Sequence, residues 1–324
     1  MSSSPSVAAV IVTYNRLEKL RLTLERTLAQ PFAQVIVIDN ASTDGTGDYL
    51  REIGDARLRL VHETENRGGA GGFMRGFELA AQESGADWLV CYDDDAYPSP
   101  DALVRFADLA LGPDVGGVAA SVYFPDGSIC PMNRPGMDIF HSPLVLARAL
   151  LRPGRAVGLD DEAYQGHAPL PVSFSSFVGL FVRCDLVRDV LGLPQADLFI
   201  YRDDSLYTMA LTKAGYKLLF APDLRFVHDC TTSSSGKRIY SPLWKAYYVI
   251  RNDLYFFRAF AGAYFYAILP LLMVKFLSSV LFYDDPSLFL RIAKIAFLDG
   301  IRKDFSRSHA TVLTLAVRAM AEFG

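Results

Sequence analysis

The sequence has few of the features that place a protein in a specialised structural class. Its 324 residues include only four cysteines, Cys91, Cys130, Cys184 and Cys230, which are widely spaced and form no C-x-x-C pair. Disulfide frameworks and zinc sites usually show denser or more regular cysteine spacing. We therefore expect buried, reduced thiols rather than disulfides or a zinc site.

A large charge of one sign is also missing. The formal net charge is −4, and the sequence has neither a basic arm nor an RNA-binding signature, so we expect no nucleic-acid partner. The first residues, MSSSPSVAAVIVTYN, lack the basic stretch that precedes the apolar segment of a signal peptide. We therefore expect a cytoplasmic protein, and the apolar fraction of 51% indicates a globular chain with a substantial core.

No uninterrupted apolar run is long enough to cross a bilayer. The longest apolar stretch without a charged residue, 259–274, is shorter than the ~20 residues that a spanning helix needs, and it contains Pro270. Residues 241–324 are nevertheless dense in aromatic and aliphatic side chains, and we expect them to form a helical region after a domain at 1–240. A packed helical subdomain and attachment to a membrane surface both stay open for this region, and a transmembrane span is the lesser alternative.

Short apolar segments alternate with helix-like segments in the first hundred residues. The apolar, β-branched runs are 7–14, 33–40, 58–63 and 87–93, and the helix-like stretches are 17–28, 47–53 and 69–83. This alternation is typical of an α/β protein with a parallel sheet. Every run ends in a polar loop, and ligands of such sheets bind at the carboxyl ends of the strands.

Three consecutive carboxylates, Asp93, Asp94 and Asp95, follow the fourth apolar run. Carboxylate oxygens are hard ligands that suit Mg²⁺ or Mn²⁺. Asp93 and Asp95 have the spacing to face one ion from a strand end, and Asp94 then faces elsewhere. His228 closes a later apolar run and is a candidate third ligand.

A second acidic pair, Asp203 and Asp204, lies at the start of a helix-like segment. Helix N-termini favour negative charge, so capping is one interpretation. A general base that takes a proton from an acceptor hydroxyl is the other.

The glycine-rich run NRGGAGGFMRG does not match a dinucleotide-binding loop. A G-x-G-x-x-G pattern from Gly69 and Gly71 requires glycine where Met74 stands, and the run follows the third apolar segment rather than the first. These glycines more plausibly allow close approach of a ligand or tight helix packing.

Together these motifs resemble the family 2 glycosyltransferases, which have the GT-A fold. The resemblance covers about residues 6–255 and rests on VAAVIVTYNR, VIVIDNAS, NRGGAGGF, DDDAYP, the Asp-Asp pair, the late VH, and YYVIRN. It is strongest toward bacterial galactofuranosyltransferases and rhamnosyltransferases. It implies a nucleotide-sugar-binding, Rossmann-like mixed sheet followed by the C-terminal helical region.

The resemblance implies a role for each matching residue. Metal binding falls to Asp93, Asp95 and His228, with Mn²⁺ or Mg²⁺ as the ion. Contacts to the nucleotide-sugar fall to Thr13, Asn15, Arg16, Asp39, Asn66, Arg67 and Asp94. Asp204 is the implied catalytic base; Asp203 stands where the family usually has Glu, and its contact is open. The family's acceptor-selecting loop corresponds to the irregular stretch at 113–171.

The implied activity is that of an inverting, metal-dependent transferase. UDP-galactofuranose is the first-choice donor and dTDP-rhamnose the alternative, with a cell-surface glycan or a lipid-linked molecule as acceptor. Such an acceptor suits peripheral attachment to the inner face of the cell membrane. A non-catalytic nucleotide-sugar-binding protein of the same fold is the alternative from another functional class.

Overall fold

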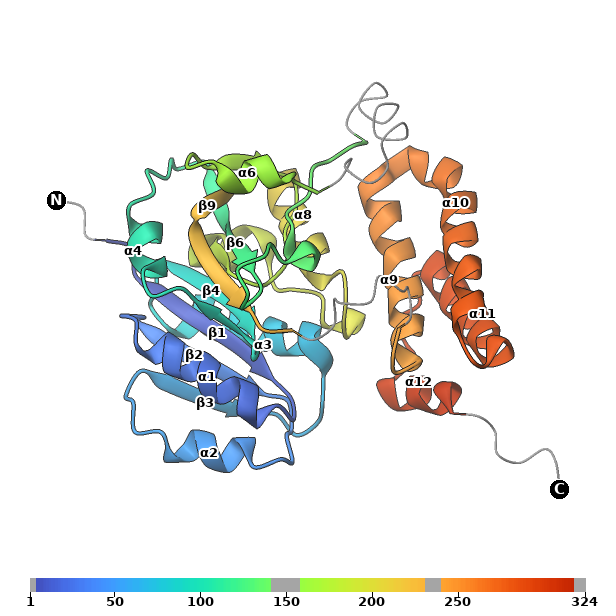
Figure 1. The fold of residues 1–324 in the computed structure, drawn as a ribbon, viewed down its shortest axis with the longest axis horizontal. Helices are drawn as coiled ribbons and strands as arrows, with labels where there is room; N and C mark the ends of the chain where they lie inside the picture. The colour runs from blue at the N-terminus through green and yellow to red at the C-terminus, as the bar shows by residue number, and fades with distance from the viewer. Residues whose placement is uncertain (1–3, 141–157, 231–239, 318–324) are drawn as a thin grey trace. The chain divides into compact units, whose positions relative to one another are not determined.

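The computed structural model describes residues 4–140, 158–230 and 240–317 (Figure 1). Contacts divide the chain into two compact units, one comprising 1–196 and 203–232 and the other 197–202 and 233–324. Part of the irregular stretch implied to select the acceptor, at 141–157, lies outside the described residues.

Four parallel strands form the first half of the sheet in unit 1, as the sequence predicts. They are β1 (Val7–Thr13), β2 (Gln34–Asp39), β3 (Leu58–His62) and β4 (Trp88–Asp93), in the spatial order β3-β2-β1-β4. The connecting helices are α1 (Leu17–Leu28), α2 (Thr46–Glu52) and α3 (Gly68–Glu83). Parallel pairing brings the polar ends of these strands to one edge of the sheet.

The second half makes the sheet mixed. Beyond β4 the order is β8 (Leu180–Arg183), β6 (Val115–Tyr123), β9 (Lys217–His228) and β5 (Ala96–Pro98), and β7 (Leu170–Val172) also pairs with β9. β6 runs parallel to β9, whereas β5 is antiparallel to it. The β5–β9 register sets Ala96 opposite His228. The acidic triplet and the histidine are therefore brought together by backbone pairing.

Shorter elements complete unit 1. They are α4 (Ala102–Ala107), η1 (Pro131–Asn133), α6 (Asp161–Gln165), α7 (Cys184–Leu186), η2 (Val187–Leu191), η3 (Ala196–Leu198, at the border with unit 2) and α8 (Asp203–Lys213). After β6 the chain reverses at Asp126–Gly127, where Gly127 has φ +83° and Tyr123 bridges Ile129. This is the hairpin turn that an Asp-Gly pair favours.

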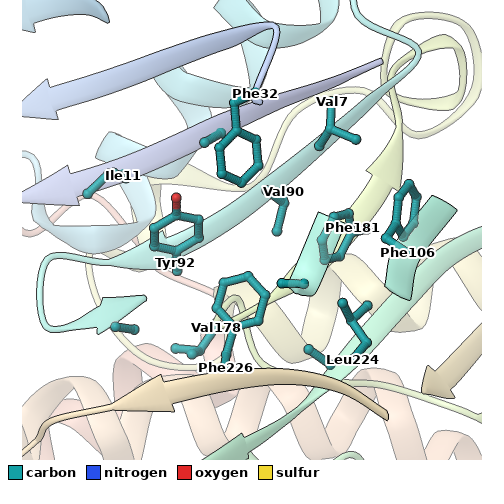
Figure 2. Packing of buried hydrophobic residues seen from close by; sticks show 14 of the residues in the cluster. Val7, Ile11, Phe32, Val90, Tyr92, Phe106, Val178, Phe181, Leu224 and Phe226 are labelled. Atoms are coloured by element: carbon teal, nitrogen blue, oxygen red, sulfur yellow. The ribbon is translucent and has the colours of Figure 1, made fainter. Parts of the chain in front are cut away.

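Two hydrophobic cores cover the two faces of the sheet. On β1, Ile11 packs into one core with α1 residues such as Leu24, and Val10 packs into the other with Phe77 of α3. Side chains alternate along a strand, so a fully buried strand supplies both cores. Figure 2 shows the first core, where the rings of Phe106 and Phe181 stack with centroids 4.2 Å apart.

The glycine-rich run forms the face of α3 that rests on β1. A Cβ atom at Gly76 would lie 2.2 Å from Cγ1 of Val10, and one at Gly72 would lie 2.4 Å from Cγ1 of Val12. Those distances leave no room for a methyl group. The structure therefore supports tight helix packing as the reason for these two glycines.

Unit 2 is helical within the residues that the structure describes. Its elements are α9 (Trp244–Ala261), η4 (Gly262–Tyr264), α10 (Phe265–Ser278), η5 (Ser279–Phe282), α11 (Pro286–Arg302) and α12 (His309–Ala316). Gly262, with φ +54°, ends α9 and separates it from α10.

Residues 197–202 are fixed to α9 by a buried amide. The side-chain N–H groups of Asn252 donate to the backbone carbonyls of Leu198, Ile200 and Tyr201 at 2.8–3.0 Å. Tyr201 has a positive φ of 70°, which side chains other than glycine rarely adopt. These hydrogen bonds hold the segment in an otherwise unfavourable backbone conformation.

We expect Gly76→Ala to destabilise unit 1. Alanine normally stabilises a helix interior by about 1 kcal/mol relative to glycine, but here the methyl group would meet Val10. Overpacking of this kind costs about 1–3 kcal/mol, and urea unfolding followed by circular dichroism would measure it. Gly69→Ala, in the same helix with no atom within 4 Å of the new methyl, is the control. A Gly76→Ala protein as stable as the Gly69→Ala protein would contradict the packing account.

Candidate active site

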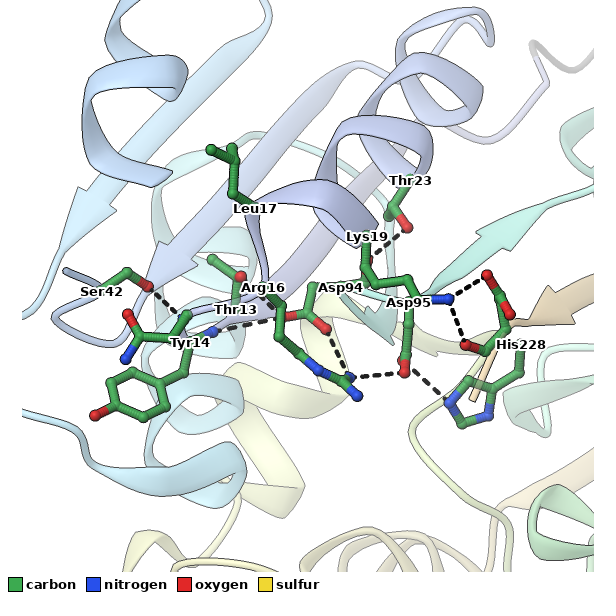
Figure 3. A network of polar contacts seen from close by, with 12 residues as sticks. Thr13, Tyr14, Arg16, Leu17, Lys19, Thr23, Ser42, Asp94, Asp95 and His228 are labelled. Atoms are coloured by element: carbon green, nitrogen blue, oxygen red, sulfur yellow. Dashed lines mark hydrogen bonds and ion pairs between the residues drawn. The ribbon is translucent and has the colours of Figure 1, made fainter. Parts of the chain in front are cut away.

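The polar strand ends meet as the sequence predicts. Thr13, at the end of β1, donates its hydroxyl to Oδ2 of Asp94, after β4, at 2.8 Å. The backbone N–H of Asn15 donates to the Oγ of Ser42 at 2.9 Å. Figure 3 shows these groups along one continuous network that ends at His228.

A single guanidinium binds two of the three clustered acids. Nη1 of Arg16 lies 3.1 Å from Oδ1 of Asp94 and 2.7 Å from Oδ2 of Asp95 (Figure 3). Both carboxylates are buried, whereas the arginine side chain is 43% exposed. Arg16, which the resemblance implies as a nucleotide contact, is thus paired with Asp94 and Asp95 in this structure.

His228 is oriented by contacts to both ring nitrogens. Nδ1 lies 2.8 Å from Oδ1 of Asn133, and Nε2 lies 3.1 Å from Oδ1 of Asp95. The Nδ2 group of Asn133 donates to the Oγ of Ser176 at 3.0 Å, so its oxygen faces the imidazole and accepts from Nδ1–H. The lone pair of the neutral ring is then on Nε2, toward the acids. No local pattern in the sequence identifies Asn133 as this partner.

Asp93, Asp95 and His228 form a group that fits a divalent ion. One ligand atom from each lies within 4.8 Å of the other two. Ligands about 2.1 Å from one ion can be about 4 Å apart, so only small side-chain shifts are needed. Two carboxylates and one imidazole suit Mn²⁺ or Mg²⁺, and Asn133 would serve as the hydrogen-bonded support that ligating histidines usually have.

Burial dominates the ionisation of this cluster. It raises the pKa of Asp93 to about 7, with a further contribution from the charge of Asp95. It raises the pKa of Asp94 to about 6, although Arg16 opposes it. Burial also disfavours the charged forms of Asp95 and His228. The hydrogen bond between these two side chains outweighs burial: it keeps the pKa of Asp95 below its usual range and raises the pKa of His228 to about 10. A cation that binds here would displace protons.

The second acidic pair begins α8, and its members differ in environment. Asp203 is buried, and burial together with the charges of Asp204 and Asp93 raises its pKa well above the usual range. Asp204 is only partly buried, and its Oδ1 accepts from the backbone N–H of Ser205 at 2.5 Å and from its hydroxyl at 3.0 Å. Asp204 is therefore the more accessible member of the pair.

Other residues implied to bind the nucleotide shape the surrounding loops. Asp39 is fully buried and accepts from the backbone N–H of Ser42 at 3.0 Å. Its other oxygen lies 2.8 Å from Nδ1 of His62. Oδ1 of Asn15 accepts from Thr43 N–H at 2.7 Å.

Asn66 and Arg67 lie just before α3. Oδ1 of Asn66 accepts from the N–H of Gly68 at 2.8 Å, which shapes the turn into the helix. The guanidinium of Arg67 is 38% exposed and lies 4.0 Å from the carboxylate of Glu63. It is therefore accessible to a ligand at this edge.

All four cysteines are free thiols, and three of them are buried, whereas Cys230 is partly exposed. The structure also brings Cys130 and Cys230 close to His228. Their separation of a hundred residues in the chain gave no indication of this proximity.

Comparisons with known proteins agree with the geometry. Residues 8–152 match the model of glycosyl transferase family 2. The undecaprenyl-phosphate mannosyltransferase of Micrococcus luteus is 40% identical over 115 residues, which cover 33% of this chain and 47% of that protein. The chain thus aligns with about half the length of that relative. Galactofuranosyltransferase GlfT1 of Mycolicibacterium smegmatis is 28% identical over 72% of this chain and 74% of its own length.

Solved structures share the fold. A mannosyltransferase from Pyrobaculum calidifontis, in complex with GDP-Man and Mn²⁺, superposes with a TM-score of 0.53 at 20% identity and covers 97% of this chain and 86% of its own. GalNAc-T7, with UDP, GalNAc and Mn²⁺, gives a TM-score of 0.58 at 14% identity, covering 94% of this chain and 57% of its own. The expected GT-A fold is confirmed. Residues 8–152 carry a glycosyl transferase family 2 domain.

Proposed function

We propose that this protein is an inverting glycosyltransferase that needs a divalent ion and moves a sugar from a nucleotide-sugar to a glycan or lipid-linked acceptor. One observation carries the proposal: ligand atoms of Asp93, Asp95 and His228 lie within 4.8 Å of one another, close enough to hold one ion, where the parallel strands end. Ligands of open α/β sheets bind at that edge. A protein that had kept only the fold would not need this set of residues.

The residues around the triplet have distinct proposed roles. Asp93, Asp95 and His228 hold the ion, and Asp94 lies near the sugar. A divalent ion held there would stabilise the negative charge of a departing diphosphate. Arg16 and Arg67 can contact the donor, since both guanidinium groups are partly exposed.

Proton removal is assigned to Asp204. The acceptor oxygen bonds to the anomeric carbon as the bond to the diphosphate breaks on the opposite face, through an oxocarbenium-like transition state, and Asp204 takes the hydroxyl proton. Asp203 has a pKa well above its usual range, because it is buried and faces Asp204 and Asp93. Its protonated form is favoured by this environment, and we therefore assign the base to the more accessible Asp204.

Three donors deserve comparison. UDP-galactofuranose is the first choice, because the likeness to the galactofuranosyltransferase extends over 72% of this chain. dTDP-rhamnose is the alternative from the resemblance. GDP-mannose is a further candidate, because the mannosyltransferase relative has the higher identity, although over only 33% of the chain.

Unit 2 supports a membrane-proximal acceptor. The segment Trp244–Phe282 is long and apolar enough to cross a membrane by length and composition, with a mean hydropathy of 2.0, and 22% of its most apolar window is buried. Gly262 interrupts its helical geometry. Large apolar side chains on α10 and η5 are exposed, among them Val274 at 65% and Leu281 at 83%. We propose that this surface lies on the cytoplasmic face of a membrane.

Asp204→Asn should lower the rate of the chemical step by about 10²–10⁴-fold, because the amide cannot accept the acceptor's proton. Asp203→Asn is the matched control: an amide resembles the neutral acid, so we expect a much smaller loss. Release of nucleotide from UDP-galactofuranose, dTDP-rhamnose and GDP-mannose would be measured with Mn²⁺ and an acceptor, at saturating donor.

Melting temperatures of both variants would exclude unfolding as the cause. If Asp203→Asn were inactive and Asp204→Asn near normal, the assignment of the base would be reversed. If the wild-type protein turned over no nucleotide-sugar while binding the ion, the non-catalytic alternative would replace the transferase.

Unit 2 should carry the protein to anionic liposomes in a flotation assay. Each well-placed cation adds about 1 kcal/mol to binding, and four exposed basic residues follow the apolar segment: Arg291, Lys294, Arg302 and Lys303. The double change Val274→Ser with Leu281→Ser should reduce flotation. Val104→Ser, which alters a side chain 60% exposed in unit 1, should not. Equal recovery in the unbound fraction with and without anionic lipid would leave only the packed-subdomain alternative.

A further inference from the structure

A second set of metal-ligating side chains, those of Cys130 and Cys230, lies close to His228. The sulfur atoms of Cys130 and Cys230 and one imidazole nitrogen of His228 all lie within 4.8 Å of one another. Cys130 is fully buried and Cys230 is partly exposed. The cluster is therefore held inside the protein and still has a side that an ion can enter from solvent.

Backbone pairing fixes the positions of both thiols. Cys130 follows the hairpin turn, and its N–H donates to the carbonyl of Val122 on β6 at 3.0 Å. β6 pairs with β9 up to Tyr123 and Val227, and Cys230 comes two residues after β9 ends at His228. The three ligand atoms thus belong to adjacent, hydrogen-bonded segments, and their proximity does not depend on one flexible loop.

The two sulfur atoms and the imidazole nitrogen favour a different kind of metal ion from the one that the carboxylates of Asp93 and Asp95 favour. Two thiols and one imidazole are the ligands that zinc and other thiophilic ions prefer, whereas Mg²⁺ and Mn²⁺ prefer oxygen. The thioether sulfur of Met132 lies 3.5 Å from the Cys230 sulfur and adds to the soft surroundings. Three protein ligands leave a fourth tetrahedral position for water.

We propose that Cys130, Cys230 and His228 form a binding site for a thiophilic divalent ion of the zinc class, and that its occupancy excludes the ion of the neighbouring acidic site. The exclusion follows from the imidazole. Nδ1–H of His228 donates to Asn133, so the neutral ring has one free lone pair, and one lone pair serves one ion at a time. The exclusion of one ion by the other rests on the proposed function, which assigns His228 to the acidic site.

The site would make the enzyme sensitive to thiophilic ions. A zinc-class ion that takes His228 leaves Asp93 and Asp95 without their third ligand and weakens Mn²⁺ binding. Neither Cys130 nor Cys230 has a part in the proposed transfer reaction. Removing a thiol should therefore abolish the sensitivity and spare Mn²⁺ binding.

Cd²⁺ titration of the reduced, metal-free full-length protein tests the site directly. Thiolate ligation gives an ultraviolet charge-transfer absorption, which we expect to saturate at one Cd²⁺ per chain. Cys130→Ser and Cys230→Ser should each weaken Cd²⁺ binding at least about tenfold and reduce the band. Cys184→Ser is the matched control, because that thiol is buried in the core and outside the cluster; it should leave the band unchanged.

Protection of the thiols in the wild-type protein gives a measurement that needs no variant. Cd²⁺ should slow alkylation of Cys230, as read by mass spectrometry of its peptide. Absence of the band together with unprotected Cys230 would overturn the site, as would a band that persists in the Cys230→Ser protein.

Competition separates this inference from the proposed function. Electron paramagnetic resonance of bound Mn²⁺ should show that Cd²⁺ releases Mn²⁺ from the wild-type protein, and that the Cys130→Ser, Cys230→Ser double variant resists release by at least about tenfold. Simultaneous binding of both ions would refute exclusion. If the thiolate band formed but Mn²⁺ never bound, the acidic metal site of the proposed function would fail and the thiol site would stand.

Discussion

The balance of charge at the end of β4 is the constraint on which the site depends. Asp94 and Asp95 are buried, and Arg16 and His228 are the cationic groups that contact them. Buried charges are tolerated only when they are paired and hydrogen-bonded. Thr23 of α1 supports this arrangement by donating to the Asp94 carbonyl at 2.8 Å. Helix α1 and the strand pairs around β4 and β9 therefore hold Asp94 and Asp95 next to the cationic side chains of Arg16 and His228.

This balance explains why the same residues serve structure and binding. Asp93 has a pKa of about 7, because burial and the charge of Asp95 disfavour its ionisation. A divalent ion would replace protons and the contact of Arg16 with one stronger interaction. Under the proposed function, Arg16 would then be free to contact the donor, since its side chain is 43% exposed.

The sequence predicted those parts of the fold that depend on local pattern. The first four strands and three helices follow apolar periodicity, and parallel pairing alone brings Thr13 and Asp94 together. Contacts between distant segments had no such pattern. Asn133 beside His228, and Cys130 beside Cys230, depend on a hairpin that returns along β6 to meet the end of β9. The antiparallel insertions that make the sheet mixed were implied by the resemblance and not by periodicity.

The claim that the acidic strand end holds a divalent ion can be tested most directly by anomalous diffraction. A crystal of the full chain grown with Mn²⁺ and UDP would be measured at the manganese absorption edge. The account predicts one strong anomalous peak bounded by the carboxylates of Asp93 and Asp95 and by Nε2 of His228, with Arg16 no longer bridging Asp94 and Asp95. Manganese located elsewhere, or no manganese at all with UDP bound and the Arg16 bridge intact, would contradict it.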